Sequence, residues 1–273
     1  MGQFHGGHDD KDMKVKVSLS RIKNKFLIMS GKGGVGKTSV SVNLAVTLAK
    51  KGYKVGLMDV DIHGPDVPRM LGLNQVAMTA GLDKIFPVHY NENLGVISVE
   101  SLSEDRDEAI IWRGPMKYNV IRQFISDVEW GDLDFLLIDA PPGTGDEPLT
   151  VCQTVIDAKA IIVTTPQEIA LADVRKSINF CKTINIGIFG IVENMSGLTC
   201  PHCSEKITLF GEGGGGEKTA TQTSIESLGQ IPFDLKMVMC ADSGISYLKA
   251  YDDSEITKAF DSIADKMVQK SRL

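Results

Sequence analysis

Apolar and polar positions follow two repeating patterns from about residue 26 onward. Short apolar runs of strand length end in polar or glycine-rich loops, and stretches with helical spacing of apolar positions follow them. The pattern predicts strands at Phe26–Ser30, Lys54–Met58, Leu94–Val99, Phe135–Asp139, Ala160–Thr164, Ile186–Val192 and Gly229–Pro232. It predicts helices at Thr38–Lys51 (closed by Gly52), Lys117–Val128, Ile169–Lys182 and Glu255–Lys270. This alternation is typical of the α/β class, with a mostly parallel sheet and helices on both faces.

The same pattern divides the chain into a tail and one domain. Residues 1–24 lack it and carry glycines, two histidines and alternating lysines, so we expect a flexible N-terminal tail there. Residues 25–273 are expected to form one domain, because α/β domains often reach this size. The glycine run Gly213–Gly216 is expected to be a flexible loop.

Composition narrows the class of protein. The net charge of −6 disfavours both a general nucleic-acid binder and a protein that docks on anionic membranes. No apolar run approaches the roughly 20 residues of a membrane-spanning helix, and the N-terminus lacks the apolar core of a signal peptide. The five cysteines are an odd number, which favours reduced thiols over disulfides. These observations predict a soluble, cytoplasmic protein.

A glycine-rich segment follows the first predicted strand and opens the first predicted helix. It matches the phosphate-binding pattern G-x-x-x-x-G-K-[ST] and reads Gly31-Lys32-Gly33-Gly34-Val35-Gly36-Lys37-Thr38. Glycines let successive backbone N–H groups point at the phosphates, and the helix adds its positive end. Lys37 can reach the β- and γ-phosphates, the Thr38 hydroxyl is a magnesium ligand, and Ser39 is expected at the α-phosphate. The segment predicts Mg-dependent ATP binding.

Three carboxylates follow predicted strands. Asp59 and Asp61 stand two residues apart on extended backbone and therefore project to the same side. One can orient the magnesium shell or the loop while the other approaches the attacking water. Asp139 ends the apolar run that begins at Phe135, which fits a strand whose last carboxylate holds magnesium through water. Aspartates that only cap the next turn are the alternative.

The pair Cys200 and Cys203 is separated by two residues, a spacing that brings two thiolates close enough to share one metal centre. Two thiolates complete neither a zinc site nor an iron–sulfur cluster, which commonly take four. A two-fold dimer can supply an identical pair, and His202 is another candidate ligand. A structural pair and a redox pair remain as alternatives. The other three cysteines are expected to be small buried hydrophobic residues: Cys152, Cys181 and Cys240.

Lys32 makes the loop resemble the deviant phosphate-binding motif, K-G-G-x-G-K-[ST], of the MinD, ParA and nitrogenase iron-protein class. In that class this lysine reaches the partner subunit's nucleotide, so the resemblance implies a nucleotide-sandwich homodimer. It also implies that Asp61 lies near the attacking water and that Asp59 supports it. The catalytic set is then Lys32, Lys37 and Asp61. A solvated loop lysine is the alternative for Lys32.

The whole chain from about residue 20 to 270 resembles the Mrp/ApbC family of iron–sulfur cluster carrier ATPases. The matching segments are the loop Gly31–Thr38, Asp59–Pro65, Asp139–Asp146, Glu193–Ser196 with Cys200-Pro201-His202-Cys203, Phe210-Gly211 and Ile231-Pro232. The resemblance implies a homodimer that bridges one [4Fe–4S] cluster between two C-P-x-C motifs and transfers it to apo-proteins, coupled to slow ATP hydrolysis. It implies that Asn194 binds the adenine, that Pro232 lines its pocket, and that a metal-binding segment is inserted around residues 194–216. Asp66 departs from the family pattern, in which a small hydroxyl residue is commoner.

Three other functions share parts of these motifs. A MinD- or ParA-like positioning ATPase would use every nucleotide residue but would not need Cys200 and Cys203. A zinc-bridged dimeric ATPase would use the thiolates for structure only, and zinc is also the expected substitute in aerobic material. An electron-donating reductase like the nitrogenase iron protein would use two separated cysteines per subunit.

Overall fold

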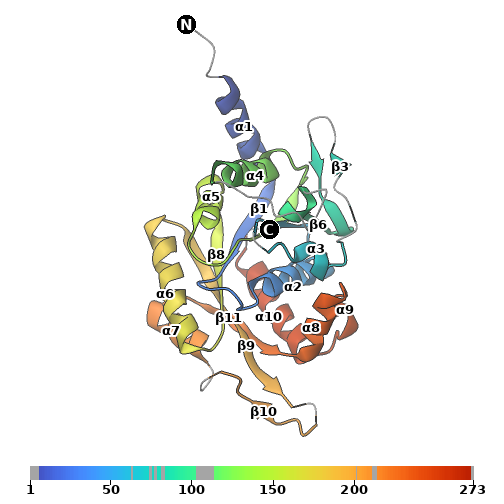
Figure 1. Ribbon diagram of the computed structural model, residues 1–273, viewed down its shortest axis with the longest axis vertical. Helices are drawn as coiled ribbons and strands as arrows, with labels where there is room; N and C mark the ends of the chain where they lie inside the picture. Colours follow the sequence, from blue (N-terminus) through green and yellow to red (C-terminus); the bar gives the residue numbers. More distant parts are fainter. Residues whose placement is uncertain are drawn as a thin grey trace.

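The computed structural model describes residues 6–62, 64–73, 76, 79–80, 84–102, 114–200, 202–210 and 214–271. Figure 1 shows a twisted sheet with helices packed on both of its faces. Helix α1 projects from one end of the molecule, and the β9–β10 hairpin projects from the opposite end (Figure 1). No helix among these residues is both long enough and apolar enough to cross a bilayer.

Nine strands of the described residues form the main sheet, in the order β10-β9-β8-β1-β7-β2-β6-β5 with β11 paired to β9. Their bounds are β1 Ile22–Met29, β2 Val55–Asp59, β5 Val88–Asn91, β6 Leu94–Ser98, β7 Leu133–Asp139, β8 Lys159–Thr164, β9 Gly187–Thr199, β10 Lys206–Ile207 and β11 Ser227–Phe233. Pairing is parallel except between β5 and β6 and between β9 and β10. The short strands β3 (Thr79–Ala80) and β4 (Ile85–Phe86) form a separate antiparallel pair.

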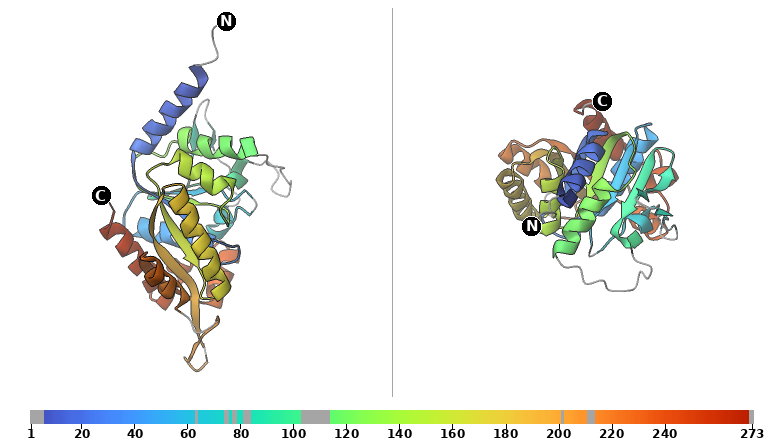
Figure 2. Two further views of the ribbon diagram at one scale, coloured as in Figure 1. Left: turned by 90° about the vertical axis from the view of Figure 1, so that its left-hand side faces the viewer. Right: turned by 90° about the horizontal axis from the view of Figure 1, so that it is seen from above.

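Helices fill the connections between strands. Their bounds are α1 Gly6–Ser20, α2 Lys37–Lys50, α3 Val67–Met70, α4 Gly114–Ser126, α5 Asp146–Thr154, α6 Glu168–Thr183, α7 Gly215–Thr223, α8 Leu235–Asp242, α9 Tyr247–Ala250 and α10 Glu255–Gln269, with a 3-10 turn at Val99–Leu102. The views in Figure 2 show α10 and the C-terminal end on one side of the sheet and α4, α5 and α6 on the other.

Two hydrophobic cores lie on the two faces of the sheet. Within β1, Leu27 and Met29 belong to the core under α4, α5 and α6, whereas Phe26 and Ile28 belong to the core under α2 and α10. All four side chains are buried. A strand covered on both faces is apolar at every position, because neither side of the sheet meets water. This explains why the central strands appear in the sequence as continuous apolar runs and confirms the predicted fold class.

Each predicted strand and helix has a counterpart, and the largest differences in strand boundaries are in β1 and β9. Strand β1 begins at Ile22 rather than Phe26, and β9 continues beyond Val192 to Thr199. The longer β9 finds partners along its whole length, first β8, then β11, and finally β10. Pairing between distant strands therefore extends an element beyond its apolar run.

The flexible tail expected over residues 1–24 is wrong for residues 6–24. Residues 6–20 form α1, and the following residues already belong to β1. Val15 is buried against the core beside α4, and Asp12 forms an ion pair with Arg122 of α4. These tertiary contacts stabilise a polar helix that the sequence pattern does not reveal. Residues 1–5 lie outside the described residues.

The loop expected at Gly213–Gly216 is also shorter than predicted. Gly214 adopts a left-handed conformation with φ of 67°, and α7 begins at Gly215. The Glu193 carboxylate accepts the Gly216 N–H at 2.5 Å and so satisfies a free donor of the first turn. Gly213 lies outside the described residues.

Candidate functional site

The loop of residues 31–36 connects β1 to α2 and is held closely on two sides. Gly36 has φ of 78°, and a Cβ on it would lie 2.3 Å from the Asn194 amide nitrogen. A Cβ on Gly31 would lie 2.4 Å from the Asp173 carbonyl oxygen in α6. Only glycine fits at these two positions. The loop is thus fixed in front of the N-terminal end of α2, where backbone N–H groups and the helix dipole favour a phosphate.

Three strands end beside this loop in register. Asp59 at the end of β2 pairs with Asp139 of β7 and with Ser98 of β6. On its other side, Asp139 pairs with Ile28 of β1, just before the loop. Both carboxylates are fully buried. The parallel register therefore places both predicted aspartates side by side at the carboxyl edge of the sheet, where α/β folds bind ligands.

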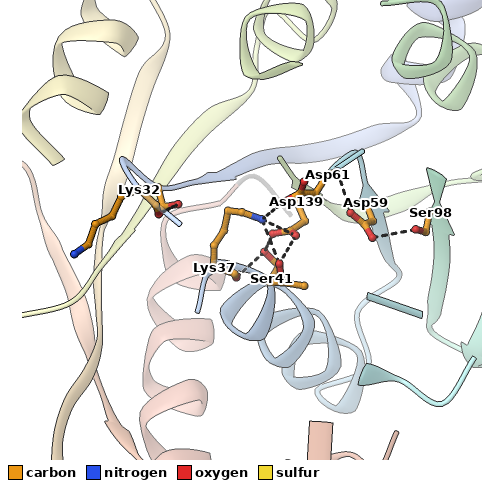
Figure 3. Close-up of polar contacts among 9 residues, drawn as sticks. Lys32, Lys37, Ser41, Asp59, Asp61, Ser98 and Asp139 are labelled. Atoms are coloured by element: carbon orange, nitrogen blue, oxygen red, sulfur yellow. Dashed lines mark hydrogen bonds and ion pairs between the residues drawn. The ribbon is translucent and has the colours of Figure 1, made fainter. Parts of the chain in front are cut away.

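Asp139 is the centre of a buried polar cluster (Figure 3). Lys37 Nζ lies 2.7 Å from Asp139 Oδ2 and 3.8 Å from Asp61 Oδ2. The Thr38 hydroxyl donates to Asp139 Oδ2 at 2.9 Å, and the Ser41 hydroxyl donates to Asp139 Oδ1 at 2.5 Å. The first turns of α2 thus supply three donors to one carboxylate. Hydroxyl and carboxylate oxygens in contact with each other suit magnesium, and the adjacent ammonium suits a phosphate.

Asp59 lies in the least polar part of the cluster. Burial raises the pKa of its carboxyl well above the ordinary value, and the neighbouring Asp139 raises it further. The Asp61 N–H donates to Asp59 at 3.1 Å and the Ser98 hydroxyl at 3.0 Å, which offsets part of the effect. Asp59 is therefore anchored in place, whereas Asp61 retains slight exposure, 8%, at the edge of the loop.

Lys32 points away from this cluster, as Figure 3 shows. Its ammonium donates to the Gln167 side-chain oxygen at 2.8 Å, and the side chain is only partly buried. The two lysines of the loop thus face different surroundings within one chain. Lys37 contacts Asp139 and Asp61 in the buried cluster, and Lys32 lies on the outer side, next to the first residues of α6.

The two spaced cysteines lie at the turn between β9 and β10. We call residues 198–207 the cysteine hairpin, of which Pro201 lies outside the described residues. Leu198 pairs with Ile207 across its base. The Cys200 N–H donates to the Glu205 carbonyl at 2.8 Å, and the Ser204 N–H donates to the Cys200 carbonyl at 2.9 Å. These bonds close a tight turn that holds Cys200 and Cys203 on one tip.

The hairpin thiols are more exposed than the other cysteines. Cys203 is exposed and Cys200 partly so, and the pKa of Cys200 is lowered by the backbone N–H groups of Cys203 and His202 and by the Cys203 thiol. Burial raises the pKa of Cys152 to about 12 and that of Cys181 to about 11. The thiolate is the form that binds metals, so Cys200 is better suited to be a ligand than Cys152 or Cys181.

The described residues give this cysteine pair no group of three possible metal ligands. In the described part of the chain, no three histidine, cysteine or acidic side chains are grouped so that they can hold a metal ion. Among these residues, His202 is therefore not grouped with Cys200 and Cys203 as a third ligand.

A family model described as ParA: NUBPL iron-transfer P-loop NTPase matches residues 21–268. The chain belongs to this family. It is 48% identical to an iron-sulfur cluster carrier protein of Methanocaldococcus jannaschii, over 95% of this chain and 89% of that protein. It is 46% identical to the cytosolic Fe-S cluster assembly factor CFD1 of Saccharomyces cerevisiae, over 92% of this chain and 89% of that protein.

Two solved structures of nucleotide-bound proteins share the fold of this chain. A nucleotide-binding protein of Archaeoglobus fulgidus in complex with ADP matches with a TM-score of 0.75 at 39% identity, over 85% of this chain and 91% of that chain. The septum site-determining protein MinD of Pyrococcus horikoshii, complexed with Mg-ADP, matches with a TM-score of 0.66 at 26% identity, over 90% of this chain and 96% of that chain. The predicted P-loop NTPase fold of the MinD and ParA type is confirmed.

The structure places the two residues expected at the adenine in different surroundings. The buried Asn194 amide donates to the Val35 carbonyl of the P-loop at 2.9 Å, so Asn194 lies against this loop. Pro232 lines a pocket of about 550 Å³ that also includes Cys200 and Tyr247. Ser39 is partly buried in the first turn of α2. The adenine contacts of Asn194 and Pro232 remain predictions.

Several polar residues of the site are absent from the sequence-based prediction. Ser41 is one helical turn after Lys37, and a buried serine at that spacing is a usable signal. Ser98 ends β6 and meets Asp59 only because β6 lies beside β2. No local pattern identifies Gln167 as the partner of Lys32, because 135 residues separate them.

Proposed function

We propose that this iron-transfer NTPase is an ATP-hydrolysing carrier that holds one [4Fe–4S] cluster between two copies of the chain and transfers it to apo-proteins. The cysteine hairpin carries the proposal: it offers two accessible thiols, half of the usual four ligands. A two-fold axis beside the hairpin would supply the other two. The names of the relatives from Methanocaldococcus jannaschii and yeast support the assignment, and the yeast name supports a cytosolic location.

The nucleotide site gives each residue a role in this proposal. Mg-ATP, when bound, supplies the phosphoryl group whose transfer to water releases energy. Lys37 and the backbone N–H groups of the P-loop bind the phosphates, and the Thr38 hydroxyl with the Asp139 carboxylate holds magnesium. Before nucleotide binds, Lys37 and Asp139 neutralise each other. The site is therefore preorganised without an unpaired buried charge.

Asp61 is proposed to orient the attacking water. It lies 3.8 Å from Lys37 at the accessible edge of the cluster, whereas Asp59 is fully buried. An Asp61→Asn variant should bind Mg-ATP normally and hydrolyse it at least about 10-fold more slowly, because an amide orders water less well than a carboxylate does. Single-turnover hydrolysis with radiolabelled ATP measures this. Unchanged turnover would assign the water to another residue.

Two other functions are distinguished from the carrier by the reconstitution experiment described below. A zinc-bridged dimer would use the same thiolates without iron, and a positioning ATPase would not need them at all. No contact of the described residues favours either function over the carrier. Four relatives at 43–48% identity, by contrast, are named iron-sulfur cluster carrier proteins.

Anaerobic reconstitution with iron and sulfide tests the proposal. We expect four iron atoms and four sulfides per dimer, a visible absorption band near that of cubane clusters, and transfer to an apo-protein of the four-iron type. Iron and sulfide assays, native mass spectrometry and recovery of the recipient's activity measure these outcomes. A full cluster on each separated monomer, or zinc retained under anaerobic conditions with no iron uptake, would refute the carrier.

A further inference from the structure

The nucleotide site and the cysteine hairpin belong to one strand. Asn194, which contacts the P-loop, and Cys200, at the hairpin tip, are joined by the last residues of β9. Six residues of extended chain span about 20 Å. Within that span the backbone is not a regular strand, and its irregularity lies against the P-loop.

The irregularity is a bulge of residues 195–197. Ile231 of β11 pairs with Asn194, and Phe233 pairs with Leu198, so only one residue of β11 stands opposite three residues of β9. The residue opposite is Pro232, which has no N–H to donate to the ladder. The missing donor gives a physical reason for the bulge at this point.

Met195 occupies the bulge in a strained conformation. Its φ is 56°, a left-handed value that residues other than glycine, asparagine and aspartate rarely adopt. Its terminal methyl group lies 3.4 Å from where a Cβ on Gly36 would stand, so the side chain packs against the P-loop. A strained residue persists only where its surroundings hold it, and here the P-loop is among them.

We propose that the bulge at Met195 transmits the nucleotide state of the P-loop to the cysteine hairpin. A bound phosphate engages the backbone N–H groups around Gly36, and any displacement of this loop moves the surface on which Asn194 and Met195 rest. The bulge then changes its twist, and the hairpin moves with it, because β10 pairs only at Leu198 and Thr199 beyond the bulge. The coupling itself does not depend on the proposed function. Only its consequence, a change in cluster retention, rests on the proposed carrier function.

The test uses thiol reactivity in metal-free, reduced protein, so it does not depend on cluster binding. Cys200 and Cys203 are accessible while the other three cysteines are buried, so iodoacetamide labels the hairpin selectively. Labelling is followed by mass spectrometry with and without Mg-ADP, at a protein concentration where sedimentation shows monomers. We expect Mg-ADP to change the labelling rate of the parent protein at least about threefold.

Two variants of Met195 separate the side chain from the backbone. Met195→Gly removes the P-loop contact and relaxes the left-handed conformation. In this variant the labelling rates with and without Mg-ADP should differ by less than about 1.3-fold. Its Mg-ADP affinity should stay within about threefold of that of the parent protein. Met195→Ala removes only the side-chain contact and should give an intermediate ratio. The matched control is Asn185→Gly, which relaxes another left-handed residue (φ 57°) at the start of the β9 region, remote from the bulge. It should keep the parent ratio.

The outcomes distinguish this inference from the carrier assignment. A parent protein whose hairpin labelling ignores Mg-ADP, or a Met195→Gly variant that keeps the full response, overturns the coupling. If the response follows the expected order but anaerobic reconstitution yields no cluster, the coupling stands and the carrier function fails. If both hold, the rate of cluster release from the Met195→Gly protein should lose its dependence on nucleotide.

Discussion

The nucleotide site and the cysteine hairpin contrast in how much of each site one chain supplies. Around Asp139, buried hydroxyl and ammonium donors from α2 meet the ends of the central strands, and the charges are paired. At the hairpin, two thiols stand on a projecting tip whose turn is closed by backbone hydrogen bonds. The first cluster is buried in the core of one chain. The second offers two accessible thiols at the periphery.

The contrast shows where each kind of chemistry has to be placed. Phosphate and magnesium binding profit from a rigid, water-poor setting, because preorganised charges interact more strongly there. A transferable cluster needs accessible ligands that a partner can complete and a recipient can approach. A stable centre for electron transfer would profit from burial, so the exposed position favours the carrier over the reductase.

The largest effect is expected from removing one hairpin thiol. Cys203→Ala should abolish cluster binding after anaerobic reconstitution, because each chain then offers one hairpin thiol and the dimer only two of the usual four. Mg-ATP affinity should remain within about twofold, since the hairpin contributes no ligand to the P-loop. Iron content and isothermal titration measure the two sites separately. Cys240→Ala is the control, and its iron content should equal that of the parent protein. If the Cys203→Ala protein retained the cluster, a residue other than Cys203 would have to be the ligand.

A second test removes the central charge of the nucleotide site. Lys37→Ala should weaken Mg-ATP binding by roughly 100-fold, as expected for about 3 kcal/mol of charge-assisted hydrogen bonds. It should also destabilise the nucleotide-free protein, because Asp139 loses its buried ion pair. Adding Asp139→Asn should restore part of the stability but none of the affinity, as seen by thermal unfolding and titration. Normal affinity in folded Lys37→Ala would contradict the P-loop assignment.

A third test asks whether Lys32 acts on the partner subunit. Lys32→Ala should bind nucleotide within about threefold of the parent, yet its ATP-dependent dimer should be at least about 10-fold weaker in sedimentation equilibrium. Within the chain Lys32 contacts Gln167, so Gln167→Ala is the matched control. If both variants behave alike, the lysine acts through that contact and not across the interface.

The smallest effect is expected from Asp59, as a dependence of stability on pH. Its pKa is raised in the folded protein, so the unfolded chain ionises at lower pH and stability falls as pH rises above about 4. Asp59→Asn removes this loss and should raise the melting temperature at pH 7.5 by about 2–4 °C, for ~1 kcal/mol. The gain should vanish near pH 4. The exposed Asp132, whose pKa is lowered by Arg21, is the control: Asp132→Asn should give no gain at neutral pH.

Local patterns in the sequence determined the elements and the identity of the key groups. The spacing from Gly31 to Thr38 is short enough to fix a loop followed by a helix start, whatever the rest of the chain does. The apolar runs before Asp59 and Asp139 similarly fix strands that end in carboxylates. The two-residue spacing of Cys200 and Cys203 requires a tight turn. Each of these inferences depends on residues less than about ten positions apart.

The tertiary structure alone decided which of these groups meet. Ser41 and Asp139 are separated by 98 residues, and the Asn194 amide and the Val35 carbonyl by 159. Strand order and register bring such pairs together, and these follow from the packing of the whole sheet. The same holds for α1, whose polar sequence gives no helical pattern but which gains stability by docking on α4. Contacts between distant residues depend on many weak packing interactions across the whole chain, so they cannot be inferred from any short segment of the sequence.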